Sequence, residues 1–97
     1  MSKLHLISQP VDLSAIKKYS ARYFSKDDEM LFLGDSVTSL LNSENAEILS
    51  QLASSIYVLA ADCCARGIDH MLPRFTHQIS DQKMVDLTLK HQQMISW

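Results

Sequence analysis

The chain is poor in residues that break regular structure or cross-link it. Its 97 residues include only two glycines, two prolines and two cysteines. Cys63 and Cys64 are immediate neighbours, so they cannot form a disulfide that joins distant parts of a fold. We therefore expect stability to come from an apolar core, which a chain of this length can form as a single domain over residues 1–97.

Long apolar runs and an excess of positive charge are also lacking. The longest apolar runs, 30–33 and 56–61, fall far short of the roughly 20 residues that a membrane span needs. The formal net charge of -2 argues against binding nucleic acid through bulk charge. The first residues contain no extended apolar region followed by a cleavage site. We expect a cytoplasmic protein without membrane contact that meets nucleic acid only locally or through a partner.

Motifs for metal binding and hydrolysis are absent as well. The chain has no Cys-x-x-Cys pair, no His-x-x-x-His pair and no Gly-x-Ser-x-Gly turn. Its four histidines are scattered: His5, His70, His77 and His91. The spacing predicts no metal site and no cofactor.

What is present is organised around the stretch 55–67. Residues 56–60 form an apolar run without alternation, which predicts a strand buried on both faces of a parallel sheet. Asp62 is the expected N-cap of a short helix, and Gly67 is the expected left-handed residue at its end. Cys63 and Cys64 would then lie at the carboxyl end of a strand, where ligands gather in open α/β sheets.

Strands and helices are predicted to alternate along the rest of the chain. Further strands are predicted at 3–7, 29–33, 76–79 and 93–97, of which 29–33 contains an apolar run. Apolar residues at three- and four-residue spacing predict helical segments at 13–24, 35–41, 46–53 and 82–91. This alternation indicates a small α/β domain with an open, mainly parallel sheet, flanking helices and right-handed crossovers.

The helix ends and one helix face can also be predicted. Asp12 is the expected N-cap of the first helix, Asp35 or Ser36 that of the second, and Ser80 or Asp81 that of the last. The last helix is expected to turn four residues towards the sheet: Met84, Val85, Thr88 and Leu89.

The residues alone indicate two candidate functional sites, and each has a structural alternative. Gly34, followed by Asp35 and Ser36, could hold an anion on free backbone amides, although a tight turn explains the glycine equally simply. A helix N-terminus favours a thiolate at Cys63 and Cys64, whereas a neighbouring carboxylate and apolar surroundings oppose it. Inert packing and persulfide transfer are both possible roles, with Cys64 the stronger catalytic candidate and Cys63 the weaker.

The segment 68–75 carries large apolar residues without a regular period. Such residues either enter the core or contact another chain, since exposed apolar patches usually mark contacts. Tryptophan and phenylalanine are enriched among interface anchors. The candidate interface residues are Ile68, Met71, Leu72, Phe75 and Trp97, with core packing as the alternative for the last.

The segment 84–97 resembles the ending of the TusB/DsrH family of sulfur-relay proteins, in which a helix with Leu-Thr-hydrophobic-Lys-His precedes a terminal tryptophan. The resemblance extends to three other places in the same order: 4–10, 34–38, and Asp62 with 65–67. It covers nearly the whole chain.

This resemblance implies a three-layer domain like those of DsrE, DsrF and DsrH. It also implies a TusB-like subunit of a TusBCD-like heterohexamer, with TusC-like and TusD-like partners. Such a complex passes persulfide sulfur from a TusA-like donor to a TusE-like acceptor for 2-thiolation of the wobble uridine of tRNA. The sulfur-carrying cysteine then belongs to the TusD/DsrE-type partner, which makes this chain a noncatalytic assembly subunit that meets tRNA only indirectly.

Two alternatives to that assignment remain. One is a thiol sulfurtransferase that acts through Cys64, and the other is a DsrH-type subunit in sulfur oxidation. Some DsrH-type members carry a cysteine near the first helix, and residues 9–24 contain none, which favours the Tus branch.

Overall fold

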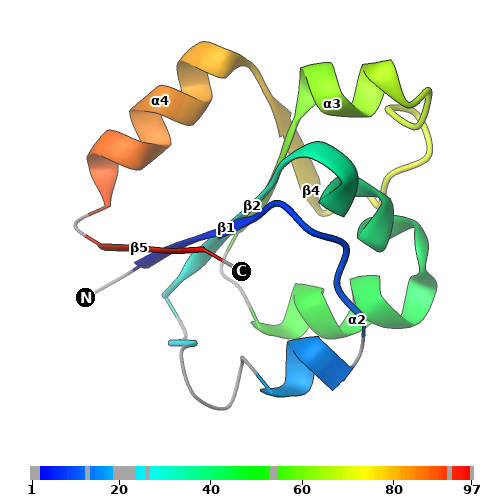
Figure 1. The fold of residues 1–97 in the computed structure, drawn as a ribbon, viewed down its shortest axis with the longest axis horizontal. Helices are drawn as coiled ribbons and strands as arrows, with labels where there is room; N and C mark the ends of the chain where they lie inside the picture. The colour runs from blue at the N-terminus through cyan, green and yellow to red at the C-terminus, as the bar shows by residue number, and fades with distance from the viewer. Residues whose placement is uncertain are drawn as a thin grey trace.

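The computed structural model describes residues 3–12, 14–18, 24–25, 27–52, 55–91 and 93–96. Its five strands form one parallel sheet in the order β4-β3-β2-β1-β5 (Figure 1). The strands are β1 (Lys3–Ile7), β2 (Glu29–Phe32), β3 (Ser55–Leu59), β4 (Thr76–Ile79) and β5 (Gln93–Ser96). The predicted α/β fold is confirmed, and the described sheet is parallel throughout.

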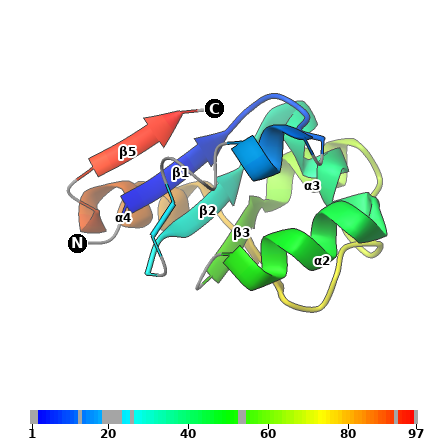
Figure 2. The same ribbon diagram turned by 90° about the horizontal axis from the view of Figure 1, so that it is seen from below.

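The face of the sheet on which each helix lies follows from the handedness of the crossovers. The described helical segments are 14–18, the 3₁₀ helix η1 (Gly34–Leu41), α2 (Ser43–Leu52), α3 (Ala60–Ala65) and α4 (Asp81–Lys90). From β1 to β4 each strand is added on the same side of the preceding one, whereas β5 returns to the other side of β1. Because crossovers are right-handed, this reversal puts α4 on the opposite face from α2, as Figure 2 shows.

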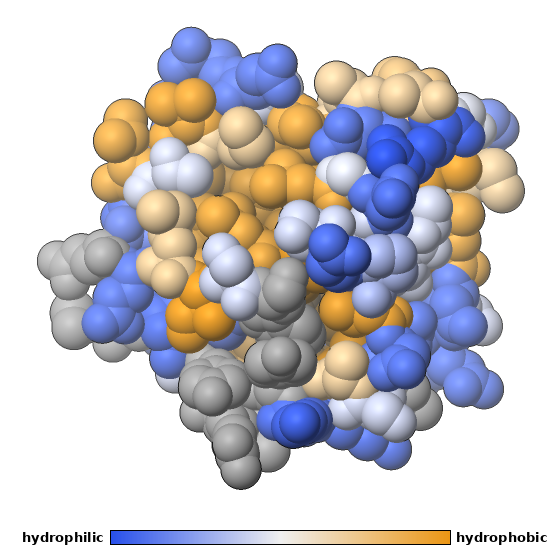
Figure 3. Space-filling model, viewed as in Figure 1, coloured by the Kyte–Doolittle hydropathy of each residue, from blue (hydrophilic) through white to orange (hydrophobic). Residues whose placement is uncertain are grey.

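On the face that carries α4, the apolar cluster is small. Leu4, Leu31, Ile79 and Leu87 are buried there among the described residues. Four neighbours are only partly buried: Leu6, Leu33, Tyr57 and Met84. Figure 3 shows apolar side chains at the surface along α4 and in a hollow beside it. This face of the sheet is therefore incompletely covered.

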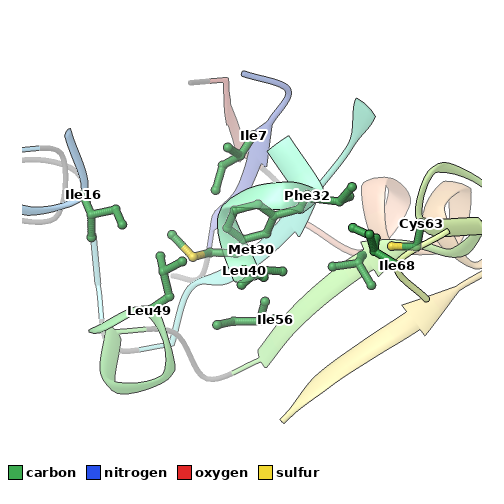
Figure 4. Packing of buried hydrophobic residues seen from close by; sticks show 11 residues of the cluster. Ile7, Ile16, Met30, Phe32, Leu40, Leu49, Ile56, Cys63 and Ile68 are labelled. Atoms are coloured by element: carbon green, nitrogen blue, oxygen red, sulfur yellow. The ribbon is translucent and has the colours of Figure 1, made fainter. Parts of the chain in front are cut away.

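The opposite face carries the larger core. Eleven buried residues of the described chain pack there: Ile7, Ile16, Met30, Phe32, Val37, Leu40, Leu49, Ile56, Val58, Cys63 and Ile68. Figure 4 shows Met30, Leu40 and Leu49 pointing towards one another from a strand and two helical segments. Alternate residues of each strand supply the two faces, since successive side chains of a strand point to opposite sides.

Two of the predicted helix caps are confirmed. The Asp12 carboxylate accepts a hydrogen bond from the Ala15 amide at 2.8 Å. The Ser80 hydroxyl accepts one from the Lys83 amide at 3.2 Å. Of the helix predicted over 13–24, residues 14–18 are helical, and residues 13 and 19–23 lie outside the described part.

The other two predicted caps are wrong. Helix α3 begins at Ala60, two residues before Asp62, so Asp62 lies inside its first turn. The 3₁₀ helix begins at Gly34, ahead of both Asp35 and Ser36. The Ser36 hydroxyl nevertheless accepts a hydrogen bond from the Leu33 amide at 3.0 Å. In both places the helix starts within two residues of the end of a strand, because the sheet fixes where the chain leaves it.

Two burial predictions are also wrong. Strand β3 alternates between buried and half-buried residues, because α4 covers its second face only in part. Of the four residues predicted to face the sheet from α4, Met84 packs there and Thr88 is half-buried, whereas Val85 is 45% and Leu89 is 79% exposed. Leu87 is buried against the sheet instead. Leu87 lies three residues from Met84 and four from His91, so these three share a helix face.

Candidate functional site

The two thiols lie where the sequence predicts, directly after the carboxyl end of β3. Cys63 is buried in the larger core, and Cys64 is exposed. Burial raises the pKa of the Cys63 thiol, and the nearby Asp62 carboxylate raises it further. Because the thiolate is the reactive form, Cys63 is held in an unreactive state and acts as a packing residue. Cys64 alone of the two is accessible to another molecule.

A polar network surrounds the start of α3. Asp62 accepts a hydrogen bond from the Gly34 amide at 2.7 Å, and Arg66 contacts the Asp35 carboxylate at 2.5 and 3.2 Å. Gly34 has a φ of 55°, as the tight-turn interpretation requires. The amide that could have held an external anion is thus bonded to a carboxylate of the chain itself. This occupancy disfavours an anion or nucleotide site at 34–36.

A buried histidine–carboxylate pair joins β1 to the residue before β2. The His5 ring nitrogen Nε2 lies 2.8 Å from Asp28, and both side chains are fully buried. Asp28 also accepts hydrogen bonds from the amides of Lys3 and Ser25, each at 2.9 Å. The His5 ring stacks on Phe24 with centroids 4.4 Å apart. Burial lowers the pKa of His5, although the hydrogen bond to Asp28 partly opposes that shift.

A second pair lies on the α4 face. The Glu29 carboxylate accepts hydrogen bonds from His91 at 2.6 Å, Tyr57 at 2.9 Å and Lys90 at 3.3 Å. Burial alone would raise the pKa of Glu29, but these hydrogen bonds outweigh it and the pKa is lowered. Glu29 thereby joins β2, β3 and the end of α4.

These pairs were missed by sequence reasoning, and their arrangement is structural. From the sequence, Asp28 and Glu29 have no predicted role, and His5 and His91 are only scattered histidines. Both carboxylates are saturated by donors of the chain. Across the described residues, no group of three or more His, Cys, Asp or Glu could hold a metal ion. The available signal was a run of three acids, Asp27 to Glu29, that leads into the buried strand β2.

The interface candidates divide into two groups. Ile68 belongs to the larger core and Leu72 packs against it. Met71 and Phe75 remain at the surface, 57% and 38% exposed. Trp97 lies outside the described residues. The described helices include none that is long and apolar enough to cross a bilayer.

The chain is similar in sequence to a family of proteins and to named members of it. The family described as DsrH-like protein matches residues 10–94. Protein TusB of Yersinia enterocolitica serotype O:8 is 39% identical over 87 residues, covering 89% of this chain and 87% of that protein. Protein TusB of Yersinia pestis (strain Pestoides F) is 35% identical over 86 residues, again covering 89% and 87%.

A solved structure is similar over the whole length. The crystal structure of the ychN protein from E. coli matches with a TM-score of 0.73 and covers 100% of both chains. The two sequences are 14% identical, so this likeness concerns the fold. It agrees with the three-layer domain that the family resemblance implies.

Proposed function

The chain belongs to the DsrH-like family, and from this membership we propose that it works as a TusB-like subunit inside a larger sulfur-relay complex. The observation that carries the proposal is the 39% identity to a protein named TusB over 89% of the chain. The resemblance first noticed in the segment 84–97 is thereby confirmed at the level of the family.

The complex that we propose contains TusC-like and TusD-like subunits in a heterohexamer. It receives persulfide sulfur from a TusA-like donor and delivers it to a TusE-like acceptor for 2-thiolation of the wobble uridine of tRNA. In this assembly the chain contacts proteins, and tRNA is reached only through them. Met71, Phe75 and Trp97 are candidate contacts with the neighbouring subunits, because the first two expose apolar surface.

We assign the chain a supporting rather than a sulfur-carrying role. Cys63 is buried and its pKa is raised, which removes one of the two thiols from consideration. The buried charged pairs are saturated by donors within the chain and offer no free acid or base. An assembly of several subunits can shield a persulfide from solvent thiols while presenting it to successive partners.

Co-purification is the test of this proposal. The tagged chain is co-expressed with untagged TusC-like and TusD-like proteins, and the mass of the purified assembly is measured by light scattering. We expect a stable complex that contains all three chains. Recovery of the chain alone, with the other two proteins soluble in the same lysate, would contradict the assignment.

A second candidate function rests on the exposure of Cys64. In a sulfurtransferase reaction its thiolate would attack the outer sulfur of a donor persulfide, forming a new S–S bond while the donor leaves as a thiolate. The complex is incubated with a labelled persulfide donor, and the adduct is mapped by mass spectrometry. Label on Cys64, together with lost transfer in Cys64→Ser, would favour this alternative. Label confined to a TusD-like subunit would instead favour a role for this chain that does not involve carrying sulfur.

A further inference from the structure

Helix α4 and the edge strand β5 expose apolar residues that no described part of the chain covers. Val85, Leu89 and Met94 are 45%, 79% and 52% exposed. Met94 lies in register with Leu4, so its side chain points to the α4 side of the sheet. We call these three residues the α4 surface. Figure 3 shows the apolar side chains in this region, next to the hollow beside α4.

The face of the sheet beside α4 is also incompletely covered. Five strands about 4.8 Å apart span about 20 Å, whereas a helix with its side chains is about 10–12 Å across. One helix therefore covers only part of the sheet, and Leu6 and Leu33 remain half-buried beside it. Parallel sheets are normally buried on both faces, so the face needs additional cover.

The charges on α4 indicate what kind of chain supplies this cover. With a rotation of about 100° per residue, Asp81 and Asp86 lie within about 60° of Val85 or Leu89 around the helix. Both aspartates are exposed. Lys83 and Lys90 lie about 100° or more away from the two apolar residues. Lys90 is also drawn to Glu29 at 3.3 Å, away from the outer side. Val85 and Leu89 are thus bordered by the carboxylates of Asp81 and Asp86, the second of which accepts a hydrogen bond from Gln82 at 3.4 Å.

These carboxylates disfavour a second copy of the chain as the occupant. In a two-fold pairing that packs Val85 of one copy against Leu89 of the other, the antiparallel helices bring both Asp86 side chains close to the axis. Like charges opposed in this way cost affinity, whereas lysine or arginine at the same place is attracted. Charge complementarity therefore selects a different chain with a basic border.

We infer that the α4 surface is the docking site for a partner subunit that presents an apolar face bordered by lysine or arginine. This inference rests on the proposed function, because the partner is expected among the other subunits of the complex. It assigns α4 a role in addition to that of Met71 and Phe75, which lie in another part of the chain.

The test compares matched variants in the complex. The double variant Val85→Ser/Leu89→Ser removes the exposed apolar groups, and Leu41→Ser is its control, since Leu41 is 39% exposed at the end of η1. The dissociation constant of each variant for the purified TusC-like and TusD-like subunits is measured by calorimetry. We expect at least a tenfold increase for the double variant and no change for the control.

A charge variant tests the nature of the partner. Asp86→Lys should weaken binding, and more strongly at low salt, because electrostatic attraction between exposed groups is screened by ions. The control is Glu47→Lys, which changes an exposed charge of α2 on the opposite face of the sheet. We expect binding by this control to equal that of the unaltered chain.

The outcomes separate this inference from the proposed function. A double variant that binds as the unaltered chain does would overturn the docking site while leaving the complex intact. Self-association of the unaltered chain in sedimentation, abolished by the double variant, would identify a second copy as the occupant and also overturn it. If the unaltered chain binds neither companion subunit, both the inference and the proposed function fail. Thermal melts of each variant confirm that the fold is retained.

Discussion

The two faces of the sheet differ in how completely the chain covers them. On one face the helical segments 14–18, η1 and α2 contribute buried residues to a core of eleven. On the other face a single helix buries four residues and leaves Leu6 and Leu33 half-exposed. The first face provides most of the apolar burial that stabilises the domain. The second face is left available for another molecule.

Both faces nevertheless contain a histidine–carboxylate pair near the amino end of the sheet. His5 and Asp28 lie on the larger core side, where two backbone amides and a stacked ring complete the site. Glu29 and His91 lie on the α4 side, where Glu29 accepts hydrogen bonds from the side chains of Tyr57, Lys90 and His91. The second pair therefore holds the end of α4 against β2, whereas the first pair holds the residue before β2 against β1.

The largest expected effect is in the larger core. Phe32→Ala removes a fully buried ring and should destabilise the fold by about 3–5 kcal/mol. Leu87→Ala is the counterpart on the α4 face, and we expect about 2 kcal/mol because the more open surroundings can relax. Urea unfolding followed by circular dichroism measures both. A loss for Leu87→Ala that equals or exceeds the loss for Phe32→Ala would contradict the difference between the faces.

The second effect concerns the fastening of α4. Glu29→Gln keeps the shape of the side chain but removes the charge that three donors satisfy, and we expect a loss of about 1.5–3 kcal/mol in the free energy of unfolding. Glu47→Gln, at an exposed position of α2, should change it by no more than about 0.5 kcal/mol. Hydrogen exchange should also show faster opening of α4 in the first variant. Equal free energies of unfolding for the two variants would show that Glu29 does not hold α4 to the sheet.

The third effect is a pH dependence. Burial lowers the pKa of His5 below 6.5, so its stabilising contribution is complete above pH 6.5 and is lost as the pH falls through the lowered value. Each unit of displacement corresponds to about 1.4 kcal/mol. The lowered pKa of Glu29 adds a further loss below its ordinary value of 4.5. The free energy of unfolding should therefore decrease from pH 7.5 to pH 5.5. His5→Gln should flatten this decrease, and His70→Gln, at an exposed position, should leave it unchanged.

The smallest effect on stability should occur on the α4 surface. Leu89→Ser changes a residue that is 79% exposed, so the free energy of unfolding should shift by no more than about 0.5 kcal/mol. Urea unfolding measures this shift. A loss above about 1.5 kcal/mol, which is roughly what burial of one apolar side chain contributes, would show that Leu89 is packed in solution. The site would then belong to the core and could not serve for docking.

The succession of strands and helices along the chain and the mainly parallel pairing of the strands were accessible from the residues. The run 56–60 is apolar, and the segments 3–7 and 76–79 are short stretches between helical patterns, so each local pattern matches one element. Gly67 takes the left-handed conformation that its place after a short helix predicts, with a φ of 67°. Asp12 and Ser80 cap helices because the groups involved are only three residues apart in the chain.

The errors occur where groups distant in the chain meet. The Asp62 carboxylate accepts a hydrogen bond from the amide of Gly34, which is 28 residues away, and does not cap its own helix. The predicted face of α4 included Leu89 in place of Leu87, because Val85 and Leu89 also have helical spacing and only docking on the sheet distinguishes the two sets. His5 and His91 looked isolated since their carboxylates are 23 and 62 residues away.

The sequence by itself determined the elements, the parallel α/β class and the family, because each depends on local periodicity or on residues in fixed order. Only the tertiary structure decided which acids pair with His5 and His91, and that α4 is the one described helix on its face of the sheet. Those outcomes depend on the return of β5 to the side of β1, and a right-handed crossover then carries α4 across the sheet. No local pattern encodes that placement, since it arises from the arrangement of all five strands.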